Sequence, residues 1–261
     1  MIFDVKPSLV GHRGFGAGAP GGWRENSVGS FLAAAESGVG WVEADARRSR
    51  DGVLVLWHDP VTPDGRLIVD LTAAELAATG IVRLAEVLTA LPATVGVNID
   101  VKTTLRDATD PHAQRTHALV AEMLRLYAGT RPFFVSSFDP SLPCYLEDSA
   151  SLAGHVALGL ITDTGFPADH AIPAAANLGF DAVCLSTRTL RVGRGGGPQT
   201  RQILDVAHEA GLEVMAWSPD PAESVELAEA GADALCVNDI PGVRAALAAA
   251  MKQVRQFVDG E

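Results

Sequence analysis

Cysteine is scarce in this sequence of 261 residues. Its three cysteines, Cys144, Cys184 and Cys236, are odd in number, widely spaced and without a C-x-x-C pair, which excludes a disulfide framework and a thiolate zinc site. We expect all three side chains to be small buried hydrophobic groups.

Positive charge is also in short supply. Lysine and arginine number 20 against 32 aspartates and glutamates, which leaves a formal net charge of −12 at pH 7. Proteins that hold nucleic acid or an anionic membrane do so mainly through a basic face. We therefore expect no nucleic-acid partner and no stable membrane association, although a few local cations could still hold a small anion.

Long apolar runs are absent as well. No stretch approaches about 18 uninterrupted apolar residues, and the N-terminus has no apolar segment behind a basic start. We expect a cytoplasmic protein, and the alternative is a secreted protein whose leader is missing from this sequence. The sequence leaves the oligomeric state open.

The chain is rich in alternating strand-like and helix-like segments. With 48% hydrophobic residues it can fill a large core, and short β-branched runs alternate with longer stretches of helical period, as in repeated βα units. Strands are predicted at residues 8–12, 41–46, 95–101, 133–136, 155–160, 182–185, 213–217 and 234–237. Helices are predicted at residues 27–37, 85–91, 111–127, 140–149, 169–178, 199–210, 222–230 and 241–254, with a frayed polar tail beyond.

Eight strands are the number that closes a parallel barrel. We therefore predict a single α/β domain over residues 1–261, a TIM-type (β/α)8 barrel. An open doubly wound sheet would use the same units, but no glycine-rich dinucleotide motif supports it. Residues 47–83 break the rhythm with an extra apolar strand at 53–58 and a turn-rich piece at 60–70. This interval predicts a small insertion after the second strand, at the mouth of the barrel.

Acidic side chains follow a pattern on two of the predicted strands. Glu43 and Asp45 are two residues apart, so both point to one side of their strand, and Asp100 and Lys102 have the same relation on the next strand. Neighbouring buried carboxylates repel one another unless a cation neutralises them. An isolated pair would indicate only a solvated strand end, but two pairs on apolar strands predict one hard divalent cation: Mg²⁺, Ca²⁺ or Mn²⁺.

Histidines and cations accompany these carboxylates. His12 and His58 each end an apolar strand, and imidazoles beside such a cluster suit acid–base catalysis near neutral pH. Arg13 and Lys102 could clamp phosphate oxygens or pair with the carboxylates. Together with a metal, these groups predict cleavage of a phosphate ester. The remaining histidines are expected to be structural: His112, His117, His155, His170 and His208.

The same residues belong to a series of short motifs in a fixed order. The series runs GHRG at 11–14, ENS at 25–27, VEAD at 42–45, DGVLV at 51–55 with HD at 58–59, and NIDVK at 98–102. Weaker matches continue to NDIP at 238–241, so the similarity spans nearly the whole chain. In this series the chain closely resembles the glycerophosphodiester phosphodiesterase family.

The resemblance implies a TIM-type barrel and the hydrolysis of a small glycerophosphodiester to sn-glycerol 3-phosphate and an alcohol, with one divalent cation. It implies that Asn26, a motif residue, binds substrate, although this side chain is equally suited to cap the following helix. The other implied roles are His12 and His58 as the acid–base pair, Glu43, Asp45 and Asp100 as metal ligands, Arg13 and Lys102 as phosphate ligands, and Trp217 at the glycerol or head-group side.

Departures from the family's pattern keep other functions open. The family has glutamate where Asp100 stands, whereas D-x-K is similar to the sphingomyelinase D-like branch, which releases a cyclic phosphate. A lyase of that kind, acting on lysolipids or sphingomyelin, is the alternative function, and a non-catalytic phosphodiester-binding barrel is a third. The segment 186–198, with Arg188, Arg191 and Arg194, is idiosyncratic. We expect a solvated crossing there, with head-group binding as its alternative.

Overall fold

The computed structural model of the protein describes residues 1–16, 22–127, 129–146, 156–192 and 197–258, with side chains as far as residue 253. Within these residues nine strands form one sheet. They are β1 (Ser8–Gly11), β2 (Trp41–Arg48), β3 (Leu54–Leu56), β4 (Gly96–Val101), β5 (Phe133–Ser137), β6 (Val156–Ile161), β7 (Ala182–Ser186), β8 (Glu213–Trp217) and β9 (Ala234–Val237). The predicted strands agree with these bounds to within two residues, and residue 155 lies outside the described part.

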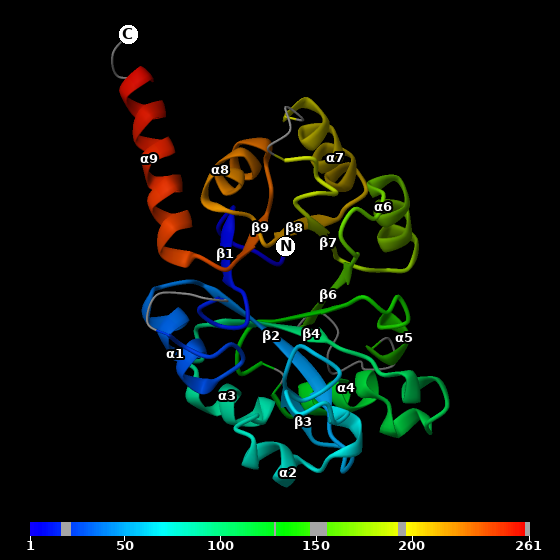
Figure 1. The fold of residues 1–261 in the computed structure, drawn as a ribbon. Coiled ribbons are helices and arrows are strands. Elements are labelled where there is room, and N and C mark those ends of the chain that lie inside the picture. Colours follow the sequence, from blue (N-terminus) through cyan, green and yellow to red (C-terminus); the bar gives the residue numbers. More distant parts are fainter. Residues whose placement is uncertain (17–21, 128, 147–155, 193–196, 259–261) are drawn as a thin grey trace.

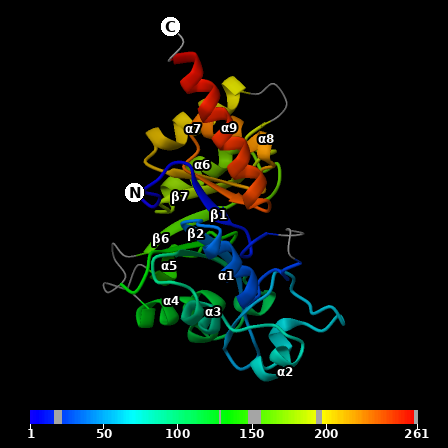
Figure 2. The same cartoon turned by 90° about the vertical axis from the view of Figure 1, so that its left-hand side faces the viewer.

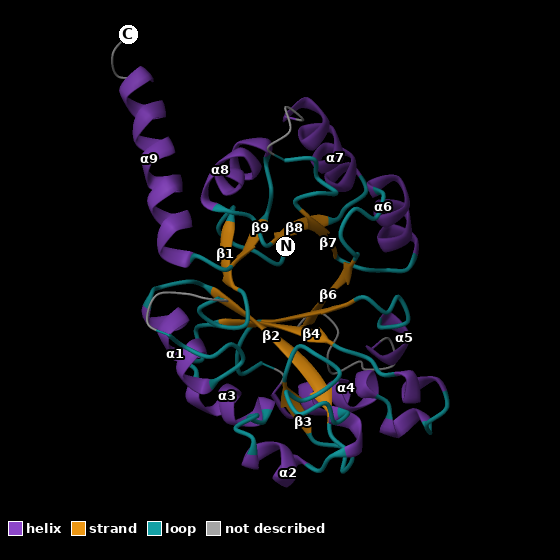
Figure 3. Cartoon of the chain, viewed as in Figure 1, coloured by secondary structure: helices purple, strands orange, loops and turns teal. Residues whose placement is uncertain are grey.

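Eight of these strands are parallel and close into a ring. Neighbouring strands follow the order β1-β9-β8-β7-β6-β5-β4-β2, and β1 also pairs in parallel with β2, where Val10 lies opposite Trp41. Figures 1 and 3 show the ring of strands with helices around its outside. The TIM-type barrel is thus confirmed. The doubly wound alternative is wrong, because an open sheet would leave two edge strands without this closing pair.

Helices lie outside the ring and connect successive strands. They are α1 (Val28–Glu36), α2 (Ala73–Ala78), α3 (Leu84–Ala90), α4 (Thr116–Tyr127), α5 (Pro143–Leu146), α6 (Ala168–Asn177), α7 (Gly197–Glu209), α8 (Pro221–Ala230) and α9 (Ile240–Val258). Three 3-10 helices are η1 (Ile68–Asp70), η2 (Leu105–Ala108) and η3 (His112–Gln114). In Figures 1 and 2 the C-terminal end of α9 extends beyond the rest of the molecule.

Three predicted helices differ from those observed. The helix predicted at 111–127 begins only at Thr116, because the chain first forms the 3-10 turn η3 and is then extended at Arg115. The helix predicted at 140–149 is the short α5, and residues 147–149 lie outside the described part. The last helix continues to Val258, where the sequence predicts a frayed tail after residue 254.

The segment after β2 forms a small unit beside the barrel. β3 pairs antiparallel with β2, and the chain then passes through η1 and α2 before it reaches α3, as Figure 1 shows. Its apolar side chains share a core of their own, made by Val55, Ile68, Leu71, Ala73, Leu76 and Ile81. The sequence-based prediction omits α2, whose signal is the capping box in which Thr72 and Glu75 exchange hydrogen bonds.

Aromatic rings fill the end of the barrel where the strands begin. Phe3 is fully buried and meets Trp41 and Phe134 edge-on, with ring centroids 5.5 and 5.8 Å away. The backbone N–H groups of Ile2 and Phe3 donate to the carboxylate of Glu213, the first residue of β8. The N-terminal segment therefore plugs this end of the barrel, and the polar mouth lies at the opposite end.

One expectation about the cysteines is wrong. Cys184 and Cys236 are buried in β7 and β9, but Cys144 is exposed, because it stands on the outer helix α5 instead of in a strand. Among the described helices, none is both long and apolar enough to traverse a lipid bilayer.

Candidate active site

A cavity of about 250 Å³ opens at the mouth of the barrel. Side chains from β1, β2, β4 and the β3 loop give one half of it a polar lining, whereas β5 to β9 give the other half a mainly apolar one. Of the nine predicted site residues, Asp45 and Asn26 do not line it and are buried beneath its surface. The seven that line it are His12, Arg13, Glu43, His58, Asp100, Lys102 and Trp217.

Three acidic side chains, Glu43, Asp45 and Asp100, form one cluster because β2 and β4 lie in register. Asp45 is opposite Asp100, and Glu43 is opposite Asn98, so alternate side chains of both strands enter the barrel at the same levels. One oxygen atom from each of the three carboxylates lies within 4.8 Å of the other two. All three residues are buried. We call them the carboxylate cluster.

The carboxylate cluster fits a hard divalent cation. Burial, together with repulsion from Asp45 and Asp100, raises the pKa of Glu43 well above its usual value. Burial also raises the pKa of Asp100 to about 6, despite the attraction of Lys102. Glu43 Oε1 and Asp100 Oδ1 are buried and have no hydrogen-bond partner in the described part of the chain. Unsatisfied carboxylate oxygens at this spacing are the ligands that Mg²⁺, Ca²⁺ and Mn²⁺ prefer.

Asp45 anchors the two basic side chains of the site. Its Oδ1 lies 3.1 Å from Lys102 Nζ, and its Oδ2 lies 3.2 Å from Arg13 Nε. Burial opposes the charge of Asp45, but Lys102 and Arg13 outweigh it and lower the pKa of this carboxyl. Lys102 also donates to Asp100, and Arg13 Nη1 donates to Glu25 at 2.6 Å. Both cations are therefore paired with carboxylates at the cavity wall.

Asn26 supports Asp45 and does not line the cavity. Its Nδ2 donates to Asp45 Oδ2 at 2.8 Å, and its Oδ1 accepts from the Asp45 N–H at 3.2 Å. The alternative expectation, that Asn26 caps α1, is wrong, because the side chain of Ser27 accepts from the Ser30 N–H. Asn26 has a φ of 54°, a left-handed conformation that asparagine adopts more readily than most residues, and this turn brings its amide to β2.

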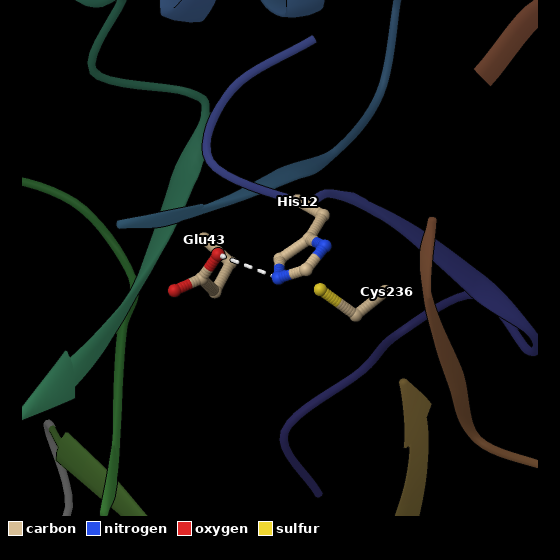
Figure 4. A group of neighbouring side chains, drawn as sticks. All are labelled: His12, Glu43 and Cys236. Carbon is tan, nitrogen blue, oxygen red and sulfur yellow. Dashed lines mark ion pairs between the residues drawn. The ribbon is translucent and has the colours of Figure 1, made fainter. Parts of the chain in front are cut away.

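His12 follows β1 and is held from both sides. Figure 4 shows its ring with Glu43 on one side and Cys236 on the other. Nδ1 lies 2.8 Å from Asn238 Oδ1, and Nε2 lies 3.8 Å from Glu43 Oε2. Burial and the neighbouring charge of Arg13 lower the pKa of His12 to about 4. The ring is therefore neutral at pH 7, and with its proton on Nδ1 it directs the lone pair of Nε2 toward the carboxylate cluster.

Cys236 lies close enough to His12 and Glu43 for the three to be considered as metal ligands. Burial and the nearby Glu43 raise the pKa of the Cys236 thiol well above its usual value. Thiolate sulfur is a soft ligand, whereas hard divalent cations prefer oxygen atoms. The all-oxygen carboxylate cluster is therefore the better cation site of the two.

His58 reaches the cavity from the loop that follows β3. Its Nδ1 lies 2.8 Å from Asp59 Oδ1. Its side chain is 44% exposed, compared with 17% for His12. The two histidines thus border one cavity from different environments, one buried and one open to solvent.

Three supporting residues have no role in the sequence-based prediction. Asn238 holds His12, Glu25 holds Arg13, and Asn98 accepts a hydrogen bond from Ser136 Oγ at 2.9 Å while its own buried Nδ2 has no partner in the described part of the chain. All three lie inside the motifs at 25–27, 98–102 and 238–241. The motifs were the available signal, because the contacts join residues that lie between 12 and 226 positions apart in the chain.

The described histidines and arginines that were expected to have no catalytic role do not line the cavity. His208 pairs with Asp233 at 2.8 Å, and buried His117 lies 3.2 Å from Ser137 Oγ. His112 and His170 are also not among the lining residues, and His155 lies outside the described part of the chain. Arg188 and Arg191 are exposed, and Arg194 is not among the residues described.

Sequence comparison connects the chain to known proteins in two ways. The profile of the Glycerophosphoryl diester phosphodiesterase family matches residues 12–241. The Mycobacterium tuberculosis protein named "Probable glycerophosphodiester phosphodiesterase 2" is 39% identical over 87 residues. That match covers 30% of this chain and 33% of the relative, so the chain spans about a third of the length of the curated relative it matches.

Solved structures share the fold. A Galdieria sulphuraria protein classed with the glycerophosphodiester phosphodiesterases has a TM-score of 0.76 at 23% identity, over 94% of this chain and 98% of that one. An Oleispira antarctica phosphodiesterase, solved in complex with its product sn-glycerol-3-phosphate, has a TM-score of 0.73 at 22% identity, over 93% and 97%. At such identities the likeness establishes the fold alone.

Proposed function

Because the chain belongs to the Glycerophosphoryl diester phosphodiesterase family, we propose that it hydrolyses glycerophosphodiesters to sn-glycerol 3-phosphate and an alcohol. The product bound to the Oleispira antarctica relative supports this choice of substrate. The observation that carries the proposal is that two histidines, two basic side chains and two members of the carboxylate cluster, Glu43 and Asp100, border one cavity. Cleavage of a phosphate ester needs such groups to move protons and to stabilise charge on phosphate oxygens.

His12 serves as the general base. Its neutral ring, with a pKa lowered to about 4 by burial, keeps a lone pair on Nε2. That atom accepts the proton of the attacking hydroxyl as the hydroxyl oxygen bonds to phosphorus. Asn238 fixes the ring through Nδ1 and so keeps Nε2 directed at the reaction.

His58 serves as the general acid. Asp59 holds its Nδ1, which leaves Nε2 to donate a proton to the departing alkoxide. One O–P bond forms and one P–O bond breaks, while one proton passes to His12 and one leaves His58. With water as the attacking hydroxyl, the products are the phosphate monoester and the free alcohol.

Arg13 and Lys102 hold the phosphate oxygens, as charges already fixed by Asp45. The carboxylate cluster would hold one divalent cation, Mg²⁺, Ca²⁺ or Mn²⁺, and this cation, when bound, would stabilise the charge that develops on the phosphorus oxygens. Trp217 forms part of the apolar wall on the substrate's glycerol or head-group side.

A panel of substrates crossed with a panel of metals tests the proposal. Chelator-treated protein is assayed on glycerophosphocholine, glycerophosphoethanolamine and glycerophosphoglycerol with Mg²⁺, Ca²⁺ or Mn²⁺, and the products are followed by phosphorus NMR. We expect release of sn-glycerol 3-phosphate that renewed chelation abolishes. His12→Ala and His58→Ala should each lower kcat by about 10²–10⁴-fold with the fold intact. His170→Ala, which removes an exposed histidine of α6, is the matched control and should keep full activity.

Two outcomes would replace the proposal. A cyclic phosphate as the final product would identify the lyase reaction that Asp100 and Lys102 suggest. If the wild-type protein turned over no substrate with any metal but bound the diesters in a calorimeter, the barrel would be a binding module.

A further inference from the structure

His58 lies beyond the hydrogen-bonded pairs that join β3 to β2. The last paired residue of β3 is Leu56, which lies opposite Ala46 of β2. The Trp57 N–H still donates to the Asp45 carbonyl at 3.0 Å, and His58 then follows with a side chain that is 44% exposed. Packing alone therefore fixes this residue weakly. A proton donor, however, loses most of its effect when it is displaced by about 1 Å.

Arg47 of β2 holds the main chain of His58 by hydrogen bonds. Arg47 is only 8% exposed and lies on the same side of its strand as Glu43 and Asp45. Its Nε and Nη2 both donate to the His58 carbonyl oxygen, at 2.9 and 2.5 Å. Two donors of one rigid guanidinium on a single oxygen set both the distance and the direction of the His58 main chain.

The His58 carbonyl oxygen is the main hydrogen-bond partner of Arg47. A buried guanidinium is costly unless it is paired, yet Arg47 forms no ion pair in the described part of the chain. Arg48 is similarly buried but faces the other side of β2, where it pairs with Asp107 at 3.1 Å and with Asp110. Arg47 is not among the residues that line the cavity, so it is not placed to contact a substrate there.

We propose that Arg47 is a positioning residue for catalysis, which keeps the His58 imidazole in the cavity by holding the His58 main-chain carbonyl. Asp59 then sets the rotation of the ring through Nδ1. The inference rests on the proposed function, in which His58 donates a proton. Arg47 itself touches neither the substrate nor the reacting atoms.

Steady-state kinetics of three variants tests this role. Arg47→Met should lower kcat by about 10²-fold, while KM changes by less than about threefold because the groups proposed to hold phosphate are untouched. Arg47→Lys keeps the charge and should recover part of kcat. Arg48→Met is the matched control: it removes an equally buried guanidinium from the opposite face of β2, so it should lower the melting temperature and leave kcat unchanged.

NMR of the His58 ring gives a readout that does not depend on turnover. The ring ¹H–¹³C resonances of His58 in the substrate-free protein are assigned from their loss in His58→Gln. In Arg47→Met these resonances should sharpen and move toward those of a mobile histidine, while the His12 resonances stay in place. If the wild-type protein hydrolysed no glycerophosphodiester, the proposed function would fail and this measurement would still test the position of His58.

Two results would overturn the inference. One is a folded Arg47→Met variant with wild-type kcat and unmoved His58 resonances. The other is a raised KM at constant kcat, which would indicate that Arg47 contacts substrate. Should Arg47→Met fail to fold, as judged by circular dichroism, the NMR comparison on Arg47→Lys decides between the same outcomes, because lysine cannot reproduce the two-donor fork.

Discussion

Asp100 carries a charge that its surroundings oppose. Burial raises its pKa from 3.8 to about 6, although Lys102 attracts its charged form. A carboxyl whose pKa is higher in the folded than in the unfolded chain binds its proton more tightly when folded. Below about pH 4 it therefore costs no stability, between about pH 4 and 6 the cost grows, and above about pH 6 the cost is complete.

Asp100→Asn should remove this cost from the metal-free protein. We expect the free energy of unfolding of the variant, relative to the wild type, to increase from pH 4 to pH 6 and then to level off, as measured by urea unfolding with a chelator present. Saturating Mg²⁺ should reverse the order of stability, since only the wild type keeps all three proposed metal ligands. A difference that does not change with pH would contradict the assignment of this penalty to Asp100.

Asn238 is the residue on which the orientation of His12 depends most directly. Asn238→Leu removes the amide oxygen at His12 Nδ1, so the ring can rotate or change tautomer. We expect kcat to fall by about ten- to a hundredfold with little change in KM. Asn177→Leu, at the exposed end of α6, is the control and should have wild-type kinetics. An unchanged kcat in Asn238→Leu would remove Asn238 from the mechanism.

Seven of the residues that border the cavity were predicted from the sequence, but the partners that hold them were not. His12, Glu43 and Asp100 are polar residues that directly follow or interrupt apolar strand segments, and this contrast can be seen in the sequence. The hydrogen bond from His12 to Asn238 joins residues 226 positions apart, and only closure of the barrel brings them together. The contact of Arg47 with His58 could not be predicted for another reason. Its acceptor is a main-chain carbonyl, and no sequence pattern indicates such a contact.

Among the elements, the N-terminal segment offers the clearest separation of stability from activity. Phe3→Ala should lower the free energy of unfolding by about 3–5 kcal/mol, because it leaves a cavity between Trp41 and Phe134. It should leave kcat unchanged, since the plug lies at the end of the barrel away from the site. Val5→Ala, at a position 72% exposed, should change neither quantity. Denaturant unfolding and activity below the transition measure both effects.

The strands were predicted more accurately than the helices for a physical reason. A strand buried on both faces appears as an unbroken apolar run with polar neighbours, as β9 does in Ala234–Val237. The strand predicted at 53–58 is longer than β3, because the paired residues run only from Leu54 to Leu56, although Val53 and Trp57 are residue types that suit a strand. The six-residue α2 is too short to show a helical period, so its only signal is its cap.

For the molecule as a whole, we expect the net charge of −12 to influence how a charged substrate approaches. Anionic glycerophosphoglycerol should be repelled, whereas zwitterionic glycerophosphocholine should not. The ratio of kcat/KM for the anionic to the zwitterionic substrate should therefore rise by about two- to threefold as salt increases to about 0.15 M. A ratio that falls with salt would show that the positive groups at the mouth dominate the approach.

The closed barrel also divides the polar and the apolar lining of the cavity between two stretches of the chain. The groups proposed to cleave the ester stand between positions 12 and 102, and closure of the ring adds Asn238 at the far end of the chain. The opposing, mainly apolar wall of the cavity comes from β5 to β9, which follow in a separate stretch of the chain. Under the proposed function, substitutions in that stretch would change which alcohol is accepted and leave every proposed reacting group unaltered. Under the proposed function, the fold would thus allow the first part of the chain to stay a fixed reaction centre while the later part diversifies.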